Sequence, residues 1–312
     1  MQMNRQTSWL LTIFILLTTI SFLDAQNLPE IAIGSRSFSL GQVATMSNTD
    51  VLNSINNPAA LSKNNAYGFS LFYSRPIENT YNPSLGFYLP FYDFGTVSFS
   101  YFYYKMDRIP YWDVNGIQDG YFSYNVDEYV ISYANDFFNR FIYGINSKWM
   151  NEKFVHVNEE YGNTDHLSID LALGFYPGLN VAGLRGLIVG ITFKNLLQLN
   201  DKDVSVPREF RFIAENKSLF GNHKFTTILN VNSYESLTSG YLERMYVGLE
   251  YSYKMIALRA GYNNSLNYND DRFFFGAGVN ILFFSLDYGY GRYSENNLFY
   301  DPQQNFTLSF EL

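Results

Sequence analysis

Residues 166–174 read His-Leu-Ser-Ile-Asp-Leu-Ala-Leu-Gly, and this stretch decides the fold class. Apolar residues alternate there with polar or small ones: Leu167, Ile169, Leu171 and Leu173 against Ser168, Asp170, Ala172 and Gly174. Successive side chains of an extended strand point to opposite faces, so one face here is apolar and the other is small or charged. The stretch predicts a strand that lies between an apolar and a polar environment.

The same alternation recurs on both sides of this stretch and gives fourteen segments from Ala66 onward. They are 67–73, 85–89, 97–103, 129–133, 141–148, 166–174, 187–193, 210–212, 225–231, 245–251, 256–262, 273–281, 284–290 and 306–312. Bacterial single-chain outer-membrane barrels have an even number of such strands. The count therefore fits a transmembrane barrel.

The connections between these segments alternate between long and mostly short. Long ones include Asp107–Asp127 and Asn151–Asp165, and short ones include Tyr92–Gly95 and Ser252–Met255. Outer-membrane barrels pair long outer loops with short periplasmic turns, whereas a soluble β-sandwich has no reason to do so. We predict an all-β, 14-stranded antiparallel transmembrane β-barrel in the outer membrane of a Gram-negative (diderm) bacterium, with a soluble β domain as the alternative.

Composition supports this prediction and excludes other classes. Aromatic residues make up 19% of the chain, and barrels place aromatic rings at both membrane interfaces. The absence of Cys excludes a disulfide scaffold and a thiolate metal site. A net charge of −8 argues against nucleic acid as a partner. Outer-membrane lipid is an expected partner because a transmembrane barrel is surrounded by it.

The N-terminal region has a different character from the barrel. Arg5 precedes an apolar run from Trp9 to Phe22, and Ala25 stands before Gln26, which predicts a cleaved signal peptide over residues 1–25. Residues 26–65 lack the alternation and are rich in Ser, Asn and small residues. We assign 26–65 to a plug or, alternatively, to a linker, and 66–312 to the barrel.

Within residues 26–65, Gly34 and Gly41 permit turns. The stretch from Asn53 to Leu61 predicts a short helical turn that is broken at Pro58, because proline cannot continue a helix that began upstream.

The polar faces of the strands carry ionisable residues that we place in the lumen. They are Asp170, Lys194, Glu209, Arg211, Glu215, Lys224, Glu250, Lys254, Arg259 and Asp287. Five are acidic and five are basic, so they favour ion pairs with one another or with a plug over an ion-selective ring.

Two groups of motifs resemble a known family. Gly34-Ser35-Arg36-Ser37 and Asn57-Pro58-Ala59-Ala60-Leu61 are similar to the start of the FadL-type outer-membrane proteins. The resemblance implies that this segment folds inside the barrel as a hatch, with Gly34, Arg36, Gly41, Asn57, Pro58 and Ala59 as its key residues. Two departures are Phe38-Ser39-Leu40-Gly41-Gln42, where the family has a glycine-rich stretch, and a final Leu312 in place of the commoner aromatic residue.

The C-terminal third resembles the PorV and PorQ branch, which is associated with type IX secretion. The motifs are Val247-Gly248-Leu249-Glu250-Tyr251, Leu258-Arg259-Ala260-Gly261-Tyr262, Gly276-Ala277-Gly278-Val279, Phe284-Ser285-Leu286-Asp287-Tyr288-Gly289-Tyr290 and Phe306-Thr307-Leu308-Ser309-Phe310. This resemblance implies secreted proteins or components of a secretion machine as partners.

Residue patterns that carry catalysis or bind metal are missing from the sequence. His156, His166 and His223 lie in or beside expected loops, without a second ligand at metal spacing. The sequence has no G-x-S-x-G elbow and no phosphate-binding glycine loop. We therefore expect no catalytic residues, no metal, no cofactor and no enzymatic activity.

One expected outer loop, 103–124, is rich in aromatic residues, among them Tyr111, Trp112, Tyr121 and Phe122. Such residues are common at binding surfaces and also in the aromatic girdle of a membrane protein. Both interpretations stay open.

Three functions are compatible with these observations. The first, slightly preferred, is a binding or scaffold role in protein secretion. The second is FadL-like, hatch-gated uptake of a hydrophobic small molecule, for which an apolar path would be needed. Apolar residues on the inner register that could line such a path are Phe72, Phe102, Ile188, Ile213 and Phe274. The third is a structural barrel of unknown role.

Overall fold

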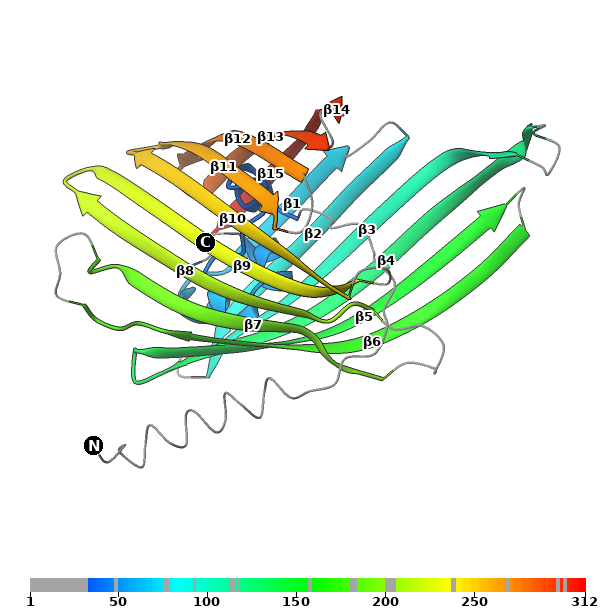
Figure 1. Ribbon diagram of the computed structural model, residues 1–312. Coiled ribbons are helices and arrows are strands. Elements are labelled where there is room, and N and C mark those ends of the chain that lie inside the picture. The colour runs from blue at the N-terminus through cyan, green and yellow to red at the C-terminus, as the bar shows by residue number, and fades with distance from the viewer. Residues whose placement is uncertain are drawn as a thin grey trace, which may run out of the picture.

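Fourteen antiparallel strands close into one barrel in the computed structural model (Figure 1). The model describes residues 33–47, 50–75, 79–91, 94–112, 116, 118–156, 159–179, 184–199, 206–236, 240–266, 270–295, 298–299 and 302–312. Neighbours in sequence pair from β1 to β13, β13 pairs with β15, and β15 closes the ring on β1. The predicted fold class and strand number are confirmed.

The strands of the ring are β1 (Gly68–Arg75), β2 (Thr80–Phe91), β3 (Gly95–Trp112), β4 (Gln118–Phe137), β5 (Phe141–His156), β6 (Glu159–Phe175), β7 (Leu187–Gln198), β8 (Glu209–Phe220), β9 (His223–Ser236), β10 (Gly240–Tyr253), β11 (Ile256–Ser265), β12 (Asp270–Ile281), β13 (Phe284–Glu295) and β15 (Gln303–Glu311). The two-residue β14 (Leu298–Phe299) pairs with the far end of β13. No helix within the described residues is both long and apolar enough to cross a membrane.

Alternation along each strand sorts the side chains between lipid and lumen. In β1, Phe69 and Leu71 are exposed on the outside, while Ser70 and Phe72 are buried inside. Aromatic rings on neighbouring strands also contact one another on the outside, as Tyr129 does with Trp149 at 5.2 Å between centroids. The outer surface is thus an apolar, aromatic belt, as expected where a barrel meets lipid.

Strands β3 to β6 are longer than a membrane requires. They contain 18, 20, 16 and 17 residues, whereas about 9–11 residues cross a bilayer. Their far ends project beyond the other strands (Figure 1). We call this the outer end of the barrel, and the end with the tight turns and the C-terminus the inner end.

The predicted outer loops 107–127 and 151–165 are therefore wrong, because most of their residues belong to these strands. Register shifts at Met106/Ile109, Pro110/Trp112 and Phe154/Val155 interrupt the pairing. Such bulges break the two-residue period from which strands are recognised in a sequence. Tyr111, Trp112, Tyr121 and Phe122 accordingly lie in β3 and β4 and not in a loop.

The N-terminal segment lies inside the ring of strands (Figure 1). We call residues 33–47 and 50–64 the lumen segment. It contains helix α2 (Ser35–Ser39) and two 3-10 helices, η1 (Val51–Ile55) and η2 (Pro58–Lys63). Nearly all of its side chains are buried. The predicted signal peptide, residues 1–25, lies outside the described residues.

Candidate functional site: the lumen and its segment

A row of glycines on the inner wall of β10 to β13 receives helix α2. Gly248 and Gly261 are register partners, and so are Gly276 and Gly289. A Cβ atom on Gly261 would lie only 2.0 Å from the backbone nitrogen of Gly41. The lumen segment can approach the wall this closely because the wall has no side chains there.

Two glycines with positive φ bound the turn that fits this row. Gly34 has φ 84° and Gly41 has φ 92°, a region that other residues rarely adopt. Between them Phe38 packs edge-on against Phe274, with 5.0 Å between ring centroids. Gly34 and Gly41, two of the six residues predicted for the plug, thus lie at the ends of this turn.

A buried chain of ion pairs joins the lumen segment to β10, β11 and β13. Arg36 donates two hydrogen bonds to Glu250, from Nε at 2.9 Å and from Nη2 at 3.0 Å. Arg259 Nε donates to the same carboxylate at 2.7 Å, and its Nη1 donates to Asp287. Bidentate guanidinium–carboxylate pairs are among the strongest hydrogen bonds in proteins, so Arg36 is a point of attachment.

Wall asparagines bind the backbone of the lumen segment at three further places. Their side-chain amides donate to carbonyl oxygens: Asn146 to Ser54 (3.0 Å), Asn230 to Ala44 (3.1 Å) and Asn263 to Gly41 (3.1 Å). A buried carbonyl without such a donor would carry a desolvation penalty. These amides allow irregular backbone to lie inside the barrel.

Glu215 of β8, two strands along the ring from Glu250 of β10, also holds the segment. Its carboxylate accepts the backbone N–H of Met46 at 2.7 Å and the hydroxyl of Ser47. The methyl group of Met46 fills the space over Gly174 and Gly190, which are register partners in β6 and β7. The segment is therefore anchored around much of the ring.

The Asn57-Pro58-Ala59 motif connects the two 3-10 helices. Pro58 does not merely end a helical turn, as predicted, because it opens η2 at the first helical position. Asn57 caps this helix by accepting from the Ala59 N–H at 3.2 Å, and its amide donates to the carbonyl oxygen of Thr45 at 2.8 Å. The motif thus fixes the direction in which the chain runs from η1 into η2.

Replacing Asn57 and Pro58 with Ala should increase the leak of small solutes through the barrel. Loss of the cap costs about 1 kcal/mol, and a buried carbonyl left without its donor costs about 1–3 kcal/mol. Swelling of liposomes that contain the purified protein measures the leak. The matched control is Asn56→Ala, since Asn56 lines the cavity above the motif. Equal swelling of the double variant and the control would contradict a closing role for the motif.

Asp50 makes the seating of the segment sensitive to pH. It lies in the lumen segment, outside the membrane-spanning strands, and burial raises the pKa of its carboxyl to about 6 from an ordinary 3.8. The Leu52 N–H and Arg36 oppose this shift, while Asp287 adds to it. The seated segment binds this proton more tightly than a released one. Protonation of Asp50 therefore stabilises the seated segment over the released one by about 3 kcal/mol below pH 3.8. This stabilisation is lost as the pH rises through 6.

We expect leak through the barrel to be larger at pH 7.5 than at pH 4.5. The variant Asp50→Asn keeps an oxygen that can accept the Leu52 N–H, as Asp50 Oδ1 does at 3.0 Å, but it removes the titration. Its leak, measured by liposome swelling, should change little between these pH values. The same pH dependence in both proteins would assign the effect to another group.

The lumen contains two cavities on either side of the segment. The outer cavity has a volume of about 530 Å³ and is lined by Ser37 and Gln42 of the segment together with strand residues near the outer end. The inner cavity has about 230 Å³ and is lined by Arg36, Ser47 and inner-end residues. Because Ser37 faces one cavity and its neighbour Arg36 the other, a single turn of chain separates them.

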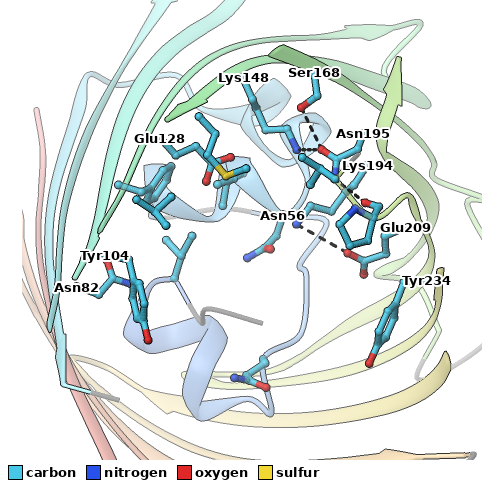
Figure 2. Close-up of a pocket in the computed structure, with 18 of the residues that line it drawn as sticks. Asn56, Asn82, Tyr104, Glu128, Lys148, Ser168, Lys194, Asn195, Glu209 and Tyr234 are labelled. Atoms are coloured by element: carbon cyan, nitrogen blue, oxygen red, sulfur yellow. Dashed lines mark hydrogen bonds and ion pairs between the residues drawn. The ribbon is translucent and has the colours of Figure 1, made fainter. Parts of the chain in front are cut away.

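Residues from around the ring point into the outer cavity (Figure 2). On one side lie Phe102, Tyr104, Tyr124 and Met150. Charged residues also line the cavity: Lys148 binds Asp170 at 2.8 Å, and Glu209 accepts from Arg211 at 2.6 Å and lies 3.8 Å from Lys194. Apolar and charged residues are therefore both present, and β5 carries Met150 as well as Lys148.

Most of the predicted lumen charges line these cavities or border the segment, but Lys254 does not. It occupies the exposed turn between β10 and β11 with φ 51°, and its ammonium lies 5.3 Å from the centre of the Tyr253 ring. Among the described residues, no group of three or more His, Cys, Asp or Glu side chains could hold a metal ion.

Four cavity residues were absent from the predicted set, Glu128, Lys148, Arg244 and Arg272, and so was Asp270, which accepts from both arginines. Lys148 follows Gly144 and Asn146 on the inner register of β5, so the alternation of the sequence could have identified it. Arg244 likewise shares a face with Tyr246, Gly248 and Glu250. Glu128, Arg244, Asp270 and Arg272 stand near the outer ends of strands, just outside the predicted segments.

Comparison with known proteins gives matches in structure only. No protein-family model and no curated protein matches the sequence. The toluene transporter TodX of Pseudomonas putida superimposes with a TM-score of 0.62 at 11% identity, over 93% of this chain and 99% of that one. The toluene transporter TbuX of Ralstonia pickettii gives 0.61 at 10% identity, over 89% and 97%.

A FadL homologue of Pseudomonas aeruginosa also superimposes, with a TM-score of 0.57 at 11% identity over 89% of this chain and 98% of that one. Identities this low establish the fold alone. With its closed fourteen-strand ring and apolar outer belt, the chain has the fold of the FadL-type outer-membrane barrels of Gram-negative bacteria.

Proposed function

We propose that the chain is an uptake channel for hydrophobic small molecules in which the lumen segment is the hatch. The observation that carries the proposal is the arrangement of two cavities separated by one turn of α2. Transport by proteins of the same fold, such as the toluene transporters TodX and TbuX, supports it. The chain acts in this proposal as a channel and not as an enzyme.

The lumen segment covers most of the apolar residues that were predicted to line a path. Phe72, Ile188, Ile213 and Phe274 are buried. Ile188 and Ile213 cluster with Met46 of the segment, and Phe274 packs against Phe38. Only Phe102 of the five predicted path residues lines the outer cavity. Passage therefore requires the segment to move away from these side chains.

The solved structures of similar fold do not support a role in protein secretion. The C-terminal motifs that suggested this role have a local explanation, because Gly248, Gly261, Gly276 and Gly289 form the row that receives α2. Glu250, Arg259 and Asp287 from the same motifs form the ion-pair chain of Arg36. Contacts with the lumen segment therefore explain these motifs, which do not point to a particular partner.

A reversible lock tests the hatch. The chain has no cysteine, and the hydroxyl oxygens of Ser35 in α2 and Thr307 in β15 lie 2.9 Å apart. The double variant Ser35→Cys and Thr307→Cys should form a disulfide that fixes the segment. In liposomes, oxidation should abolish uptake of a labelled neutral aromatic such as naphthalene, and reduction should restore it.

The single variants Ser35→Cys and Thr307→Cys are the matched controls and should be insensitive to oxidant. Uptake that continues through the fully oxidised double variant would show that the segment is not the gate. Absence of uptake by the unmodified protein would refute the transport proposal itself.

A further inference from the structure

One part of the barrel wall at the outer cavity combines apolar and aromatic side chains with carboxylates. It lies on the inward face of β3, β4 and β5, toward the outer ends of these adjacent strands. Cross-strand partners build it: Phe102 with Glu128, Glu128 with Met150, Tyr104 with Val126, and Val126 with Glu152. We call these residues, together with the inward-facing Tyr124, the β4 patch.

Glu128 differs from the other Glu, Lys and Arg residues that line the outer cavity. Each of the others is in an ion pair of 3.8 Å or less: Lys148 with Asp170, Lys194 and Arg211 with Glu209, and Arg244 and Arg272 with Asp270. Glu128 makes no hydrogen bond or ion pair of this kind with any described residue. Its side chain lines the cavity without a direct partner (Figure 2).

Two cations attract Glu128 from a greater distance, but other carboxylates hold both of them. Lys148 binds Asp170 at 2.8 Å, and Lys194 lies 3.8 Å from Glu209. Asp170 also repels Glu128 and so offsets part of this attraction. A cationic ligand can therefore reach Glu128 from the cavity without breaking an existing ion pair.

The rest of the β4 patch favours a cation that carries a flat apolar body. Tyr104 and Tyr124 contact edge-on at 6.3 Å between ring centroids, and Val126 and Met150 pack with them. Aromatic rings stack with one another, and their faces also attract cations through the ring quadrupole. Glu152 interacts with the Tyr124 hydroxyl and adds a second carboxylate. Both ionisable carboxyl groups of the patch thus favour positive charge beside the rings.

We propose that the outer cavity binds compact aromatic amines in their ammonium form. The ammonium group lies at Glu128, and the aromatic body lies against Tyr104, Tyr124 and Met150. The cavity volume of about 530 Å³ suits such a compact ligand. This inference rests on the proposed uptake function and adds the chemical class of its substrate.

Equilibrium binding to the detergent-solubilised protein tests this class directly. The probes are 2-naphthylmethylammonium, the neutral 2-naphthalenemethanol and the anion 2-naphthoate, which share one ring system and differ in charge. The ammonium should bind about tenfold more tightly than the alcohol, and naphthoate should bind more weakly than the alcohol. Equal affinity for the ammonium and the alcohol would overturn the proposal, and so would binding of naphthoate as tight as that of the ammonium.

Variants locate the two ends of the ligand. The substitution Glu128→Gln should weaken the ammonium about tenfold and leave the neutral alcohol unchanged, whereas Tyr104→Ala should weaken both. The matched control Asp127→Asn removes the next carboxylate of β4, which accepts from the Tyr101 hydroxyl on the outward face, and should change neither. Glu128→Asp keeps the charge if the Gln variant fails to fold, and should retain most of the preference for the ammonium. Unchanged ammonium affinity in a folded Glu128→Gln protein would refute the site.

Failure of this inference is distinct from failure of the uptake proposal. If the ammonium binds no better than the alcohol but naphthalene uptake still responds to the Ser35–Thr307 lock, the ammonium site is wrong and the hatch stands.

Discussion

Replacing Glu250 with Ala should release the lumen segment and raise leak through the barrel more than any other single change of charge. The substitution leaves the buried Arg36 without its bidentate partner, while Arg259 keeps Asp287. Removing one member of a buried ion pair costs about 3–5 kcal/mol. The ratio of released to seated segment should therefore rise by roughly a hundredfold to a few thousandfold.

Liposome swelling with a small sugar gives the measurement for Glu250→Ala. A matched control is Asp136→Ala, which removes the acid from an exposed pair between Lys63 of η2 and β4. Exposed pairs contribute about 0.2–1 kcal/mol, so swelling should stay near that of the unmodified protein. If the two variants swell at the same rate, Arg36 is not a principal attachment of the segment.

The substitution Gly261→Val should exclude the Leu40–Gly41 turn, which directly follows α2, from its seat. A Cβ at this position would lie 2.0 Å from the Gly41 nitrogen and 2.1 Å from the carbonyl carbon of Leu40. Both are backbone atoms, so no side chain can rotate away to make room. Overpacking costs about 1–3 kcal/mol, occasionally more, and here either the segment or the wall must shift.

Cysteine labelling reports the released segment, because the chain has no native cysteine. Ser37→Cys, introduced with Gly261→Val, should react with a bulky maleimide much faster than Ser37→Cys alone. The control is Gly162→Val in β6, where the nearest atom to an added Cβ is 3.9 Å away. Slow labelling in the Gly261→Val protein, with the barrel intact by its heat-dependent gel mobility, would show that the seat tolerates a side chain.

Most of the barrel could be predicted from the sequence, because the lipid and the lumen impose a strict two-residue period. In 166–174 the period is unbroken, and the strand was placed correctly. The two-residue period fails at the outer ends of β3 to β6. Bulges near Arg108 and Val155 shift it there, and polar residues lie on both faces of the strands. A hydrogen-bonded ladder continues there without a hydrophobic signal.

The site was predicted only in part. Arg36, Glu250 and Arg259 were identified, but no local pattern shows that one carboxylate lies between two guanidinium groups from different elements. Arg244 and Arg272 both donate to Asp270, which lies 26 residues from Arg244 in the sequence. The glycines of β10 to β13 belong to motifs that the sequence shows, but they contact residues more than 200 positions earlier in the chain.

Closure of the ring between β1 and β15 constrains the order of assembly. Gly68 pairs with Glu311, so the seam joins the two most distant strands, and the lumen segment precedes β1 in the chain. A finished ring is open only at its two ends, so a segment that is not enclosed when the seam forms has to enter through one of them. Until then two strand edges face lipid with unpaired N–H and C=O groups, each costing several kcal/mol. Pairing of the first strand with the last thus removes both edges in a single step.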